Sequence, residues 1–538
     1  MQIIKTIFPI RLIFMILYVQ VVALFLNFQL YDFQQLAIWA TWIPLLMLPY
    51  LISKKKWIFI FSAILIFIDN LLNLLHLIIV KGTLSVSSLF VIANTNLSES
   101  SDFLGLKMDF SFLLLLPYLA LFVFALLKIP QVVFSRKSII FLIIVLSYSA
   151  IYLTDNIIHA RFVRKALPTT TKTIIEFHKE IKTYKTLKKR KIQNVTATIE
   201  DNENCRQICV LVIGESVNRN HLSLYGYNRN TTSRFSARND IFVYSDVVTP
   251  YSNTLNSVLA LYTESTLANK KPVNESVSLL DIFYSAGYKT FWLSNQSPVG
   301  VWDNAVFNLA QTAENVKFVN ISSNSSFEST LKKSYDELLL AELSKILTEN
   351  PTQNLFITIH LMGSHSAYSK RYPPNFEQFR HSKDKNQKII DHYDNSILYT
   401  DFVLDSMINI LSCFSKNFNV NTSFTYCSDH GENLFDYNNT AGHDWSGYLP
   451  NCIAEIPLII WLSDNYKENY PNKTTDILKN KDLPFLSDDL FHLILDLQNI
   501  ETQYFNSLKS IINQNYTIPQ KRILEDGRNY NETRKFTF

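Results

Sequence analysis

The sequence is poor in cysteine and almost balanced in charge. Five cysteines among 538 residues are too few for a disulfide framework, and their odd number leaves at least one thiol unpaired: Cys205, Cys209, Cys413, Cys427 and Cys452. Cys205 and Cys209 could form one bridge, but no second closely spaced pair exists to complete a cysteine zinc cluster. Cys427 lies inside an apolar run, where packing is its expected role. A net charge of +4 gives no reason to expect a nucleic-acid partner.

Apolar residues are concentrated in the N-terminal third, although they make up 48% of the whole chain. Five apolar stretches there each approach the roughly 20 residues that a helix needs to cross a bilayer. They cover residues 9–29, 36–53, 57–80, 111–130 and 137–155. The first is not a cleaved signal, because its apolar run is long and more spans follow. We therefore predict an α-helical membrane domain of five transmembrane helices over residues 1–155.

Basic residues predict the orientation of these helices. Three clusters fall on one side of the membrane if the spans alternate: Lys5 with Arg11, residues 54–56, and Lys128 with Arg136 and Lys137. The positive-inside rule makes that side the cytoplasm, so the N-terminus is cytoplasmic and everything after the fifth span lies outside. The outer loop, residues 81–110, suits a helix along the membrane interface or an ordinary packing loop. The basic linker, residues 156–204, suits a solvated helix, with contact to anionic lipid headgroups as an addition.

The remaining residues, 205–538, alternate short apolar runs with amphipathic stretches of helical length. Strands are predicted at ICVLVIG, KTFWLS, LFITIHLM, SFTYCSD and IPLIIWL. Helices are predicted at SVSLLDIFYSAG, ESTLKKSYDELLLAELSKIL and IIDHYDNSILYTDFVLDSMINIL, among others. This alternation is typical of an α/β/α sandwich with a mainly parallel sheet. In such folds ligands collect at the carboxyl ends of the strands.

Candidate metal ligands follow three of the predicted strands. Glu215 ends one apolar run, Asp429 and His430 end another, and His365 follows a third in the segment GSHSAY. A mixed oxygen and nitrogen pair suits Zn²⁺ better than Mg²⁺, which prefers oxygen and bound water. Each residue also has a plainer explanation. Glu215 would cap a helix, the Asp-His pair would form a capped turn, and the histidine would be hydrogen-bonded in the core.

Thr254 is the candidate nucleophile. It stands just before an apolar helical run, where the helix dipole and free N–H groups favour an alkoxide or a phosphate. The structural alternative is a helix N-cap, although a metal that lowers the pKa of a hydroxyl makes such a residue a nucleophile. His443, beside a glycine in AGHDWSG, is expected with His365 to hold a second metal, neutralise a phosphate or protonate the leaving oxygen. Asn295 is a candidate substrate contact.

These segments together resemble the membrane-bound phosphoethanolamine transferases that modify bacterial lipopolysaccharide, within the alkaline phosphatase and sulfatase superfamily. The resemblance rests on VIGESVNRNHLSLYGYNRNTTSRF, the Thr254 segment, WLSNQ, IHLMGSHSAYSKRYP, YCSDHGENL, GHDWSGYLP and IPLIIWLSD in the family's order. Five spans, an external catalytic domain and NTNLSES in the outer loop also fit. SDHGE alone is shared across the superfamily, whereas the ordered set is specific. Ser233 stands where the family commonly has proline.

The resemblance implies a zinc enzyme of the bacterial inner membrane with its catalytic domain in the periplasm. Glu215, Thr254, Asp429 and His430 would bind Zn²⁺, and Thr254 would be phosphorylated during turnover. His365 and His443 would lie at a second zinc or at the headgroup of the donor, phosphatidylethanolamine. The cysteines do not supply the several disulfides of the lipid-A-modifying members, which leaves lipid A, an inner-core sugar or another envelope glycan open as the acceptor.

Two other functions are compatible with the sequence. The first is a phosphoglycerol transferase or a phosphatase of the same superfamily; a sulfatase is disfavoured because no Cys/Ser-x-Pro-x-Arg segment is present. The second is a non-catalytic membrane scaffold that has kept the fold. The sequence leaves open the number of zinc ions, the role of the outer loop and the oligomeric state.

Overall fold

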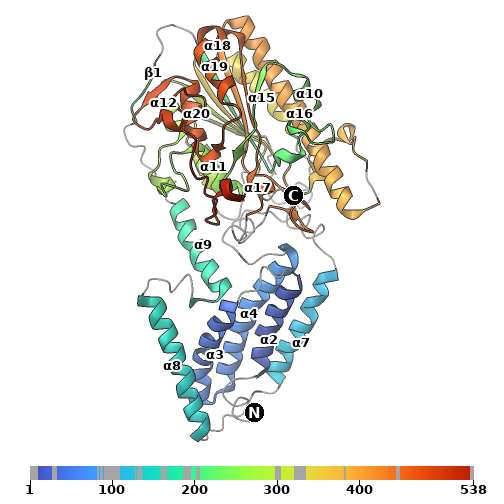
Figure 1. The fold of residues 1–538 in the computed structure, drawn as a ribbon, viewed down its shortest axis with the longest axis vertical. Helices are drawn as coiled ribbons and strands as arrows, with labels where there is room; N and C mark the ends of the chain where they lie inside the picture. The colour runs from blue at the N-terminus through green and yellow to red at the C-terminus, as the bar shows by residue number, and fades with distance from the viewer. Residues whose placement is uncertain are drawn as a thin grey trace. The chain divides into compact units, whose positions relative to one another are not determined.

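The computed structural model describes residues 10–26, 33–80, 84, 89, 110–127, 129, 136–158, 166–185, 195–200, 206–296, 305–319, 335–380, 383–443 and 449–533. These residues form two compact units, a helical one and an α/β one, shown in Figure 1. The boundary between them falls at Glu180 and Ile181, inside helix α9 (Thr169–Lys185). It therefore lies within the segment predicted as a linker.

The helical unit contains a helix at each of the five apolar stretches. They are α2 (Ile10–Leu26), α3 (Phe33–Ser53), α4 (Lys56–Val80), a 3₁₀ turn (Phe110–Leu114) that continues into α7 (Leu115–Leu127), and α8 (Arg136–Ile158). All but α2 are long and apolar enough to cross a membrane, and α2 is a shorter apolar helix in the described residues. The five predicted helices are therefore present, and the protein is a membrane protein.

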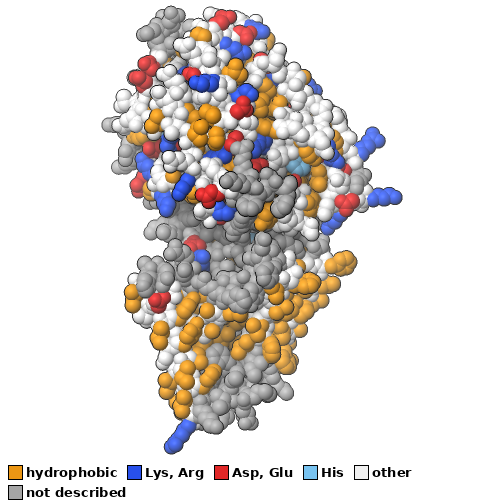
Figure 2. Space-filling view, viewed as in Figure 1, with side chains coloured by type: hydrophobic (Ala, Val, Ile, Leu, Met, Phe, Trp, Pro, Cys, Tyr) orange, Lys and Arg blue, Asp and Glu red, His pale blue; other side chains and the backbone are white. Residues whose placement is uncertain are grey.

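Apolar side chains on the outside of this unit match a lipid environment. Figure 2 shows hydrophobic side chains gathered over the helical unit, whereas most acidic and basic side chains in this view lie over the α/β unit. Inside the unit, polar side chains find partners on neighbouring helices. The Tyr18 hydroxyl donates to the Leu114 carbonyl at 2.7 Å, and the Ser62 hydroxyl donates to the Leu46 carbonyl at 2.7 Å. Such pairing is required where no water is available.

A seven-stranded sheet forms the centre of the α/β unit, in the order β3-β11-β8-β2-β7-β5-β6. Its strands are β2 (Gln207–Gly214), β3 (Ile241–Tyr244), β5 (Lys289–Ser294), β6 (Asn315–Phe318), β7 (Leu355–His360), β8 (Asn421–Ser428) and β11 (Leu458–Leu462). The four central strands β8, β2, β7 and β5 run parallel. Strand β11 is antiparallel to both of its neighbours. All five predicted strands are present in this mainly parallel sheet.

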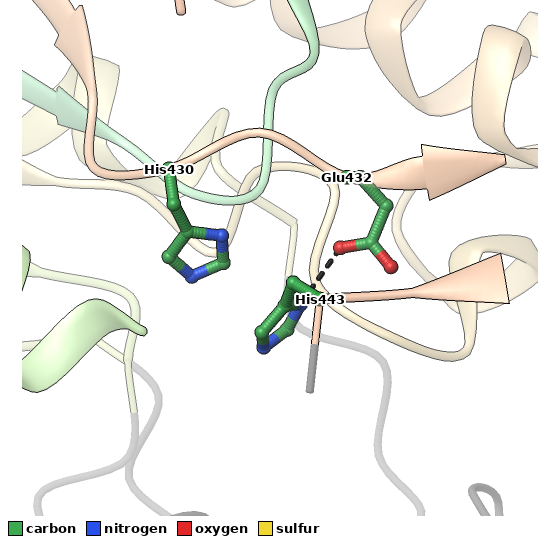
Figure 3. A group of neighbouring side chains, drawn as sticks. All are labelled: His430, Glu432 and His443. Atoms are coloured by element: carbon green, nitrogen blue, oxygen red, sulfur yellow. Dashed lines mark hydrogen bonds and ion pairs between the residues drawn. The ribbon is translucent and has the colours of Figure 1, made fainter. Parts of the chain in front are cut away.

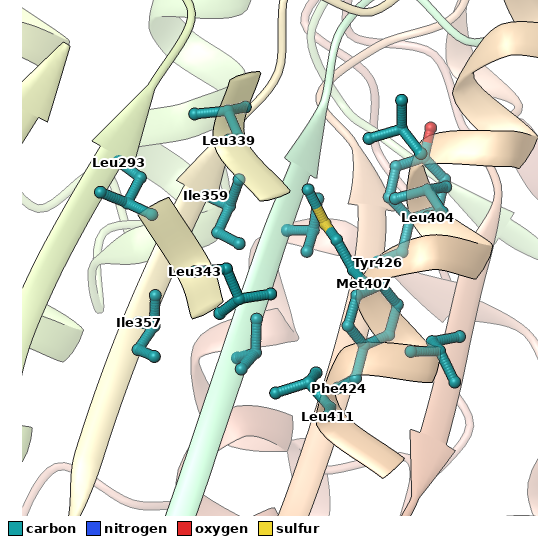
Figure 4. Close-up of a cluster of buried hydrophobic side chains, with 14 of the residues drawn as sticks. Leu293, Leu339, Leu343, Ile357, Ile359, Leu404, Met407, Leu411, Phe424 and Tyr426 are labelled. Atoms are coloured by element: carbon teal, nitrogen blue, oxygen red, sulfur yellow. The ribbon is translucent and has the colours of Figure 1, made fainter. Parts of the chain in front are cut away.

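Helices cover both faces of the sheet, because alternate side chains of each strand point to opposite sides. On one face, Ile357 and Ile359 of β7 pack under α15 (Leu338–Glu349), and Phe424 and Tyr426 of β8 pack beside α16 (Lys385–Phe418), as Figure 4 shows. On the other face, α11 (Thr254–Tyr262) and α12 (Leu279–Ser285) pack through aromatic rings. The ring of Phe283 stacks 3.8 Å from that of Phe356. The domain is the α/β/α sandwich that the sequence predicts.

Helix α16 resembles a membrane span by length and apolar content alone. Its buried face instead contributes Tyr399, Val403, Met407 and Leu411 to the core over the sheet. Aspartates also interrupt it, and Asp405 pairs with Arg238 at 2.6 Å. It is therefore a core helix of the α/β unit.

Shorter elements complete the described part of this unit. Three two-stranded pairs join β1 (Ala197–Ile199) with β13 (Ile500–Thr502), β4 (Val247–Val248) with β12 (Phe485–Leu486), and β9 (Asn433–Leu434) with β10 (Ala441–Gly442). The remaining helices are α10 (Ser233–Ala237), α13 (Ala305–Ala310), α17 (Asn451–Ala454), α18 (Asp464–Asn469), α19 (Pro471–Asn480), α20 (Leu490–Leu497) and α21 (Tyr530–Thr533).

The cysteines in the described ranges are all free thiols. Cys209, Cys427 and Cys452 are buried, and Cys413 is exposed on α16. The bridge considered between Cys205 and Cys209 is therefore not formed, since Cys209 is a buried thiol of β2; Cys205 itself lies outside the described residues. The outer loop with its NTNLSES segment also lies almost wholly outside them.

Candidate active site

The candidate ligands meet where the central strands of the sheet end. Glu215 directly follows β2, and Asp429 with His430 directly follows β8, which is paired in parallel with β2 up to Gly214 and Ser428. The backbone continues this pairing, because the Asp429 amide donates to the Gly214 carbonyl at 3.1 Å. On the other side of β2, the Ser364 amide donates to the Glu215 carbonyl at 3.0 Å, which ties in the loop after β7. Strand ends far apart in sequence therefore converge.

Glu215, Thr254, Asp429 and His430 form one cluster at this edge. The Thr254 hydroxyl lies 3.2 Å from Oε2 of Glu215 and 3.3 Å from Nε2 of His430. The same nitrogen lies 3.3 Å from Oδ2 of Asp429 and 3.7 Å from Oε1 of Glu215. Glu215, Asp429 and His430 are buried, and Thr254 is partly exposed. The one hydroxyl of the cluster is thus also its accessible group.

The two oxygens of Asp429 have different roles. Oδ1 accepts hydrogen bonds from the amides of Ser216 at 3.0 Å and His430 at 2.7 Å. These bonds form the capped turn that was the structural alternative for the Asp-His pair. Oδ2 is buried and accepts no hydrogen bond from the described residues. His430 is arranged to match, because its Nδ1 contacts the Gly431 carbonyl at 2.9 Å and must carry the proton. Its Nε2 lone pair is therefore left for the cluster.

The electrostatics of the cluster favour a bound cation. Burial and the neighbouring Asp429 carboxylate raise the pKa of Glu215 well above its usual range. Two adjacent buried carboxyl groups are costly unless a positive charge neutralises them. Ligand atoms of Glu215, Asp429 and His430 lie within 4.8 Å of one another. Together with the free oxygen of Asp429, this oxygen and nitrogen donor set fits Zn²⁺.

Thr254 is the first residue of α11, and it is not the N-cap. Asn253 has the extended backbone of a cap, and its side chain accepts from the Asn256 amide at 3.0 Å. The N-cap explanation considered for Thr254 is therefore wrong. Because Asn253 caps the helix, the Thr254 hydroxyl is available to the cluster at a helix N-terminus, where negative charge is stabilised. The helix cap considered for Glu215 is also not formed, because no helix begins at this residue. Its carboxylate instead accepts a hydrogen bond from Ser216 Oγ at 2.7 Å.

Two glycines allow the close approach of these segments. A Cβ on Gly431 would lie 2.2 Å from the Cys452 carbonyl oxygen, since the Gly431 amide donates to the Ile453 carbonyl at 2.7 Å. Gly363 has a positive φ of 51°, and a Cβ there would lie 2.9 Å from the Glu215 carbonyl. A side chain at Gly431 would overlap the Cys452 carbonyl, and one at Gly363 would be both crowded and strained by the positive φ. Glycine at each position avoids these costs.

His443 lies next to the cluster, held by a residue that the sequence reasoning missed. Its Nδ1 is 2.7 Å from Oε2 of Glu432, and its ring centroid is 4.2 Å from that of His430 (Figure 3). Burial disfavours a charged ring, but Glu432, with smaller effects of Glu215 and Asp429, raises the pKa of His443 to about 9. Glu432 ends the quoted SDHGE motif, so its position beside Asp429 and His430 was the available signal. These three residues, His430, Glu432 and His443, form a second ligand group.

His365 is half-buried on the loop after β7. Burial, and then the electrostatic effects of Arg371, His443 and His430, lowers the pKa of His365 well below the usual range. Arg371 holds the loop by donating from Nε to the His365 carbonyl at 3.1 Å. His365 thus lies in the electrostatic field of the cluster, as a half-buried histidine near the predicted ligands.

Asn295 and Gln296 follow β5 and reach different partners. The Asn295 side chain is buried and donates to Asp336 at 2.8 Å, and Asp336 accepts from the amides of Met362 and Gly363 at 2.9 Å each. The substrate contact proposed for Asn295 stays a prediction. The hydrogen bond from Asn295 to Asp336 instead helps to hold the loop that carries His365. Gln296 instead contacts the cluster, since its amide donates to Oε2 of Glu215 at 3.2 Å. The segment WLSNQ pointed to this place, one residue from the contact.

The chain is similar to proteins of known family. Residues 207–500 match the sulfatase family. The chain is similar to phosphoethanolamine transferase EptC of Escherichia coli (strain K12), 27% identical over 333 residues, which is 59% of this chain and 55% of that protein. It is also similar to EptA of the same strain, 28% identical over 328 residues, or 58% and 56% of the two chains. The chain thus spans about half the length of these curated relatives.

Solved structures show the same architecture. The C-terminal periplasmic domain of EcEptC from Escherichia coli in complex with Zn has a TM-score of 0.55 and 26% identity, covering 63% of this chain and 94% of that one. The integral membrane protein lipooligosaccharide phosphoethanolamine transferase A (EptA) from Neisseria meningitidis has a TM-score of 0.57 and 20% identity, covering 92% and 97%. The second likeness extends the shared fold over nearly the whole chain.

A helical membrane unit and an α/β/α sandwich with its ligand cluster at the carboxyl edge of the sheet define a membrane-bound protein of the alkaline phosphatase and sulfatase type. Because the family match covers more than half of the sequence, the chain belongs to the sulfatase family. The resemblance to phosphoethanolamine transferases stated from the sequence is confirmed by these relatives and structures.

Proposed function

We propose that the protein transfers phosphoethanolamine from phosphatidylethanolamine to a lipopolysaccharide acceptor, lipid A or an inner-core sugar, through a phosphorylated Thr254. The observation that carries the proposal is the position of the Thr254 hydroxyl, partly exposed at the start of α11 and within 3.4 Å of both Glu215 and His430. The named activity of EptC and EptA supports the same reaction.

Zinc is the proposed cofactor, with Glu215, Asp429, His430 and the Thr254 hydroxyl as its ligands. Oδ2 of Asp429, which accepts no hydrogen bond from the described residues, and the unprotonated Nε2 of His430 supply donors of the right kind. A zinc ion held there lowers the pKa of a ligating hydroxyl and offsets negative charge on phosphoryl oxygens. The zinc complex of the EcEptC domain supports this choice of metal.

The first step forms a bond between Thr254 Oγ1 and the phosphorus and breaks the bond from phosphorus to the diacylglycerol oxygen. Thr254 loses its hydroxyl proton, and the Glu215 carboxylate, 3.2 Å away, is placed to receive it. Diacylglycerol leaves with a proton supplied by His443, whose raised pKa keeps its ring protonated near neutral pH, whereas the lowered pKa of His365 leaves that ring neutral. In the second step an acceptor hydroxyl oxygen forms a bond to the same phosphorus and the bond from phosphorus to Thr254 Oγ1 breaks. The proton released by the acceptor hydroxyl restores the Thr254 hydroxyl.

The active site is proposed to lie on the periplasmic side of the bacterial inner membrane. The positive-inside arrangement of the sequence supports this orientation, and so do the periplasmic domains of the related structures. A catalyst attached to the membrane shares one surface with its lipid donor, which raises the effective concentration of both.

The central test is Thr254→Ala, compared with Thr254→Ser and with Thr475→Ala, whose threonine is exposed on α19. We expect Thr254→Ala to lose transfer by a factor of at least ~10³ while folding and inserting normally, since no other residue replaces a covalent nucleophile. Thr254→Ser should retain part of the activity, and Thr475→Ala all of it. Near-normal transfer by Thr254→Ala would refute the nucleophile assignment.

Labelled donors separate the rival functions. Purified protein is incubated with phosphatidylethanolamine or phosphatidylglycerol labelled in the headgroup, and the protein-bound label is identified by mass spectrometry. Phosphoethanolamine on Thr254 supports the proposal, and phosphoglycerol there would identify a phosphoglycerol transferase. Release of free phosphate with no transfer product would indicate a phosphatase. A protein that takes no label and holds no stoichiometric zinc would be the scaffold.

A further inference from the structure

The C-terminal part of the α/β unit contains a turn that contacts two other segments of the unit, one of which leads into Thr254. We define the C-terminal turn as residues 522–530. Arg522 and Tyr530 anchor it at its ends. Nη1 and Nη2 of Arg522 donate to the two oxygens of Asp246 at 2.9 and 3.1 Å, and both residues are buried. The Tyr530 hydroxyl donates to Glu455 at 2.5 Å. The turn is therefore fixed to the body of the domain.

Glu525 at the centre of this turn holds the loop that leads into Thr254. Its Oε1 accepts two hydrogen bonds from Ser252, one from the amide at 3.0 Å and one from the hydroxyl at 2.5 Å. Its own amide donates to the Pro250 carbonyl at 2.9 Å. Ser252 is 1% exposed, and Thr254 follows two residues later. Glu525 thus binds three groups of residues 250–252, just before Thr254: the Pro250 carbonyl, the Ser252 amide and the Ser252 hydroxyl.

The same turn also holds Leu449. Oδ2 of Asp526 accepts from the amide of Leu449 at 2.8 Å, and Leu449 is the first described residue after His443. Nε of Arg528 pairs with Asp526 at 2.6 Å, and its Nη2 donates to the Leu449 carbonyl. Adjacent residues of one turn therefore contact Ser252, two residues before Thr254, and Leu449.

We propose that Glu525 is a positioning residue that sets the direction in which Thr254 Oγ1 meets the phosphorus. The inference rests on the proposed role of Thr254 as nucleophile. Glu525 contacts none of Glu215, Asp429 and His430 in the described structure, so it acts through Ser252 and leaves the metal ligands untouched. In-line attack requires alignment of the reacting atoms, and a displacement of about 1 Å reduces rates by as much as ~10²-fold.

Four variants of the full-length protein in detergent test the proposal: Glu525→Ala, Glu525→Gln, Ser252→Ala and, as the control, Glu501→Ala. Glutamine keeps an oxygen that accepts from Ser252, whereas alanine removes it. Ser252→Ala removes the hydroxyl donor alone. Glu501 is exposed on β13. The probe is phosphatidylethanolamine with radiolabelled phosphorus in mixed micelles, and the quantity is the single-turnover rate of Thr254 labelling.

We expect Glu525→Ala to label at least ~10-fold more slowly, with unchanged zinc content and donor KM, and Ser252→Ala a few-fold more slowly. Glu525→Gln should stay within about twofold of the unmodified protein, because the acceptor oxygen remains. Hydrogen exchange adds a readout that needs no turnover. The Ser252 amide should exchange at least ~10-fold faster in Glu525→Ala and unchanged in Glu501→Ala.

Wild-type labelling and exchange rates in folded, zinc-loaded Glu525→Ala would overturn the proposal. If that variant does not fold, wild-type rates in Ser252→Ala overturn it instead. A loss shared equally by Glu525→Gln and Glu525→Ala would also refute it, since the acceptor oxygen would then not matter. Labelling of Thr254→Ala in the same assay would refute the nucleophile itself, and so separates a failure of the proposed function from a failure of the positioning role.

Discussion

His221 gives a quantitative prediction about stability and pH. The residue is buried, with its Nδ1 2.9 Å from Oδ1 of Asp394 and its Nε2 3.7 Å from Oδ1 of Asp436. The rings of Tyr227 and Tyr393 pack against it at 4.7 and 5.2 Å. Burial disfavours the charged imidazole, but the two aspartates outweigh this effect and raise the pKa of His221 to about 9. The folded protein therefore holds this proton more tightly than the unfolded chain does.

The sign and size of the effect follow from proton linkage. In the unfolded chain a histidine titrates near 6.5, so the stabilisation is fully present below about pH 6.5 and is lost as the pH rises through about 9. A pKa of about 9 in the folded protein, against about 6.5 in the unfolded chain, corresponds to roughly 3 kcal/mol in the free energy of unfolding. His221→Gln should remove this contribution, because glutamine occupies a similar volume but does not titrate.

The assay is denaturant unfolding of the purified protein in detergent at pH 6 and pH 10, followed by tryptophan fluorescence. Between these pH values the parent should lose about 3 kcal/mol more of unfolding free energy than His221→Gln does. Other titrating groups contribute to both proteins and cancel in the difference. His178→Gln, an exposed position on α9, is the control and should behave like the parent. Equal losses in the parent and in His221→Gln would show that the Asp394 and Asp436 contacts do not hold a proton on His221.

Two further predictions concern the cluster and its packing. Asp429→Ala should lose stoichiometric zinc by elemental analysis, because it removes a ligand from a set of three protein carboxylate and imidazole groups; zinc retained at the parental ratio would contradict the ligand assignment. Gly431→Ala should lower the melting temperature or abolish folding, since its Cβ would lie 2.2 Å from the Cys452 carbonyl and the backbone there has to move. An unchanged melting temperature, measured beside Ala286→Ser at the end of α12, would count against that close contact.

The sequence predicted the central strands well because their apolar runs are continuous. ICVLVIG and LFITIH are buried on both faces, so these strands are made mostly of apolar residues, with His360 at the end of β7 as a buried polar exception. The direction of β11 could not be predicted, because an apolar run has the same pattern whether its strand is parallel or antiparallel. The length and apolar content of helix α16 also fit a membrane span. Its aspartates and its buried face place it in the core of the α/β unit instead.

The site was partly predictable for a similar physical reason. Glu215, Asp429 and His430 follow strands that pair directly, so their convergence followed from the fold class. The cap on Asn253 and the pairing of Glu432 with His443 depend on side-chain directions that spacing does not determine. Glu525 was beyond sequence reasoning, because its contact with Ser252 joins segments 273 residues apart.

The two oxygens of Asp429 make different contacts, and this difference has a consequence for the order of folding and metal binding. Oδ1 is tied to amides of the turns that close β2 and β8, so Oδ2 points into the cluster only after these two strands have paired. An ion that needs Oδ2 cannot gather its ligands from the unfolded chain, where they are more than two hundred positions apart. Capture of the metal would then be a late event, and the moment at which a chelator ceases to remove it would mark completed assembly of the sheet.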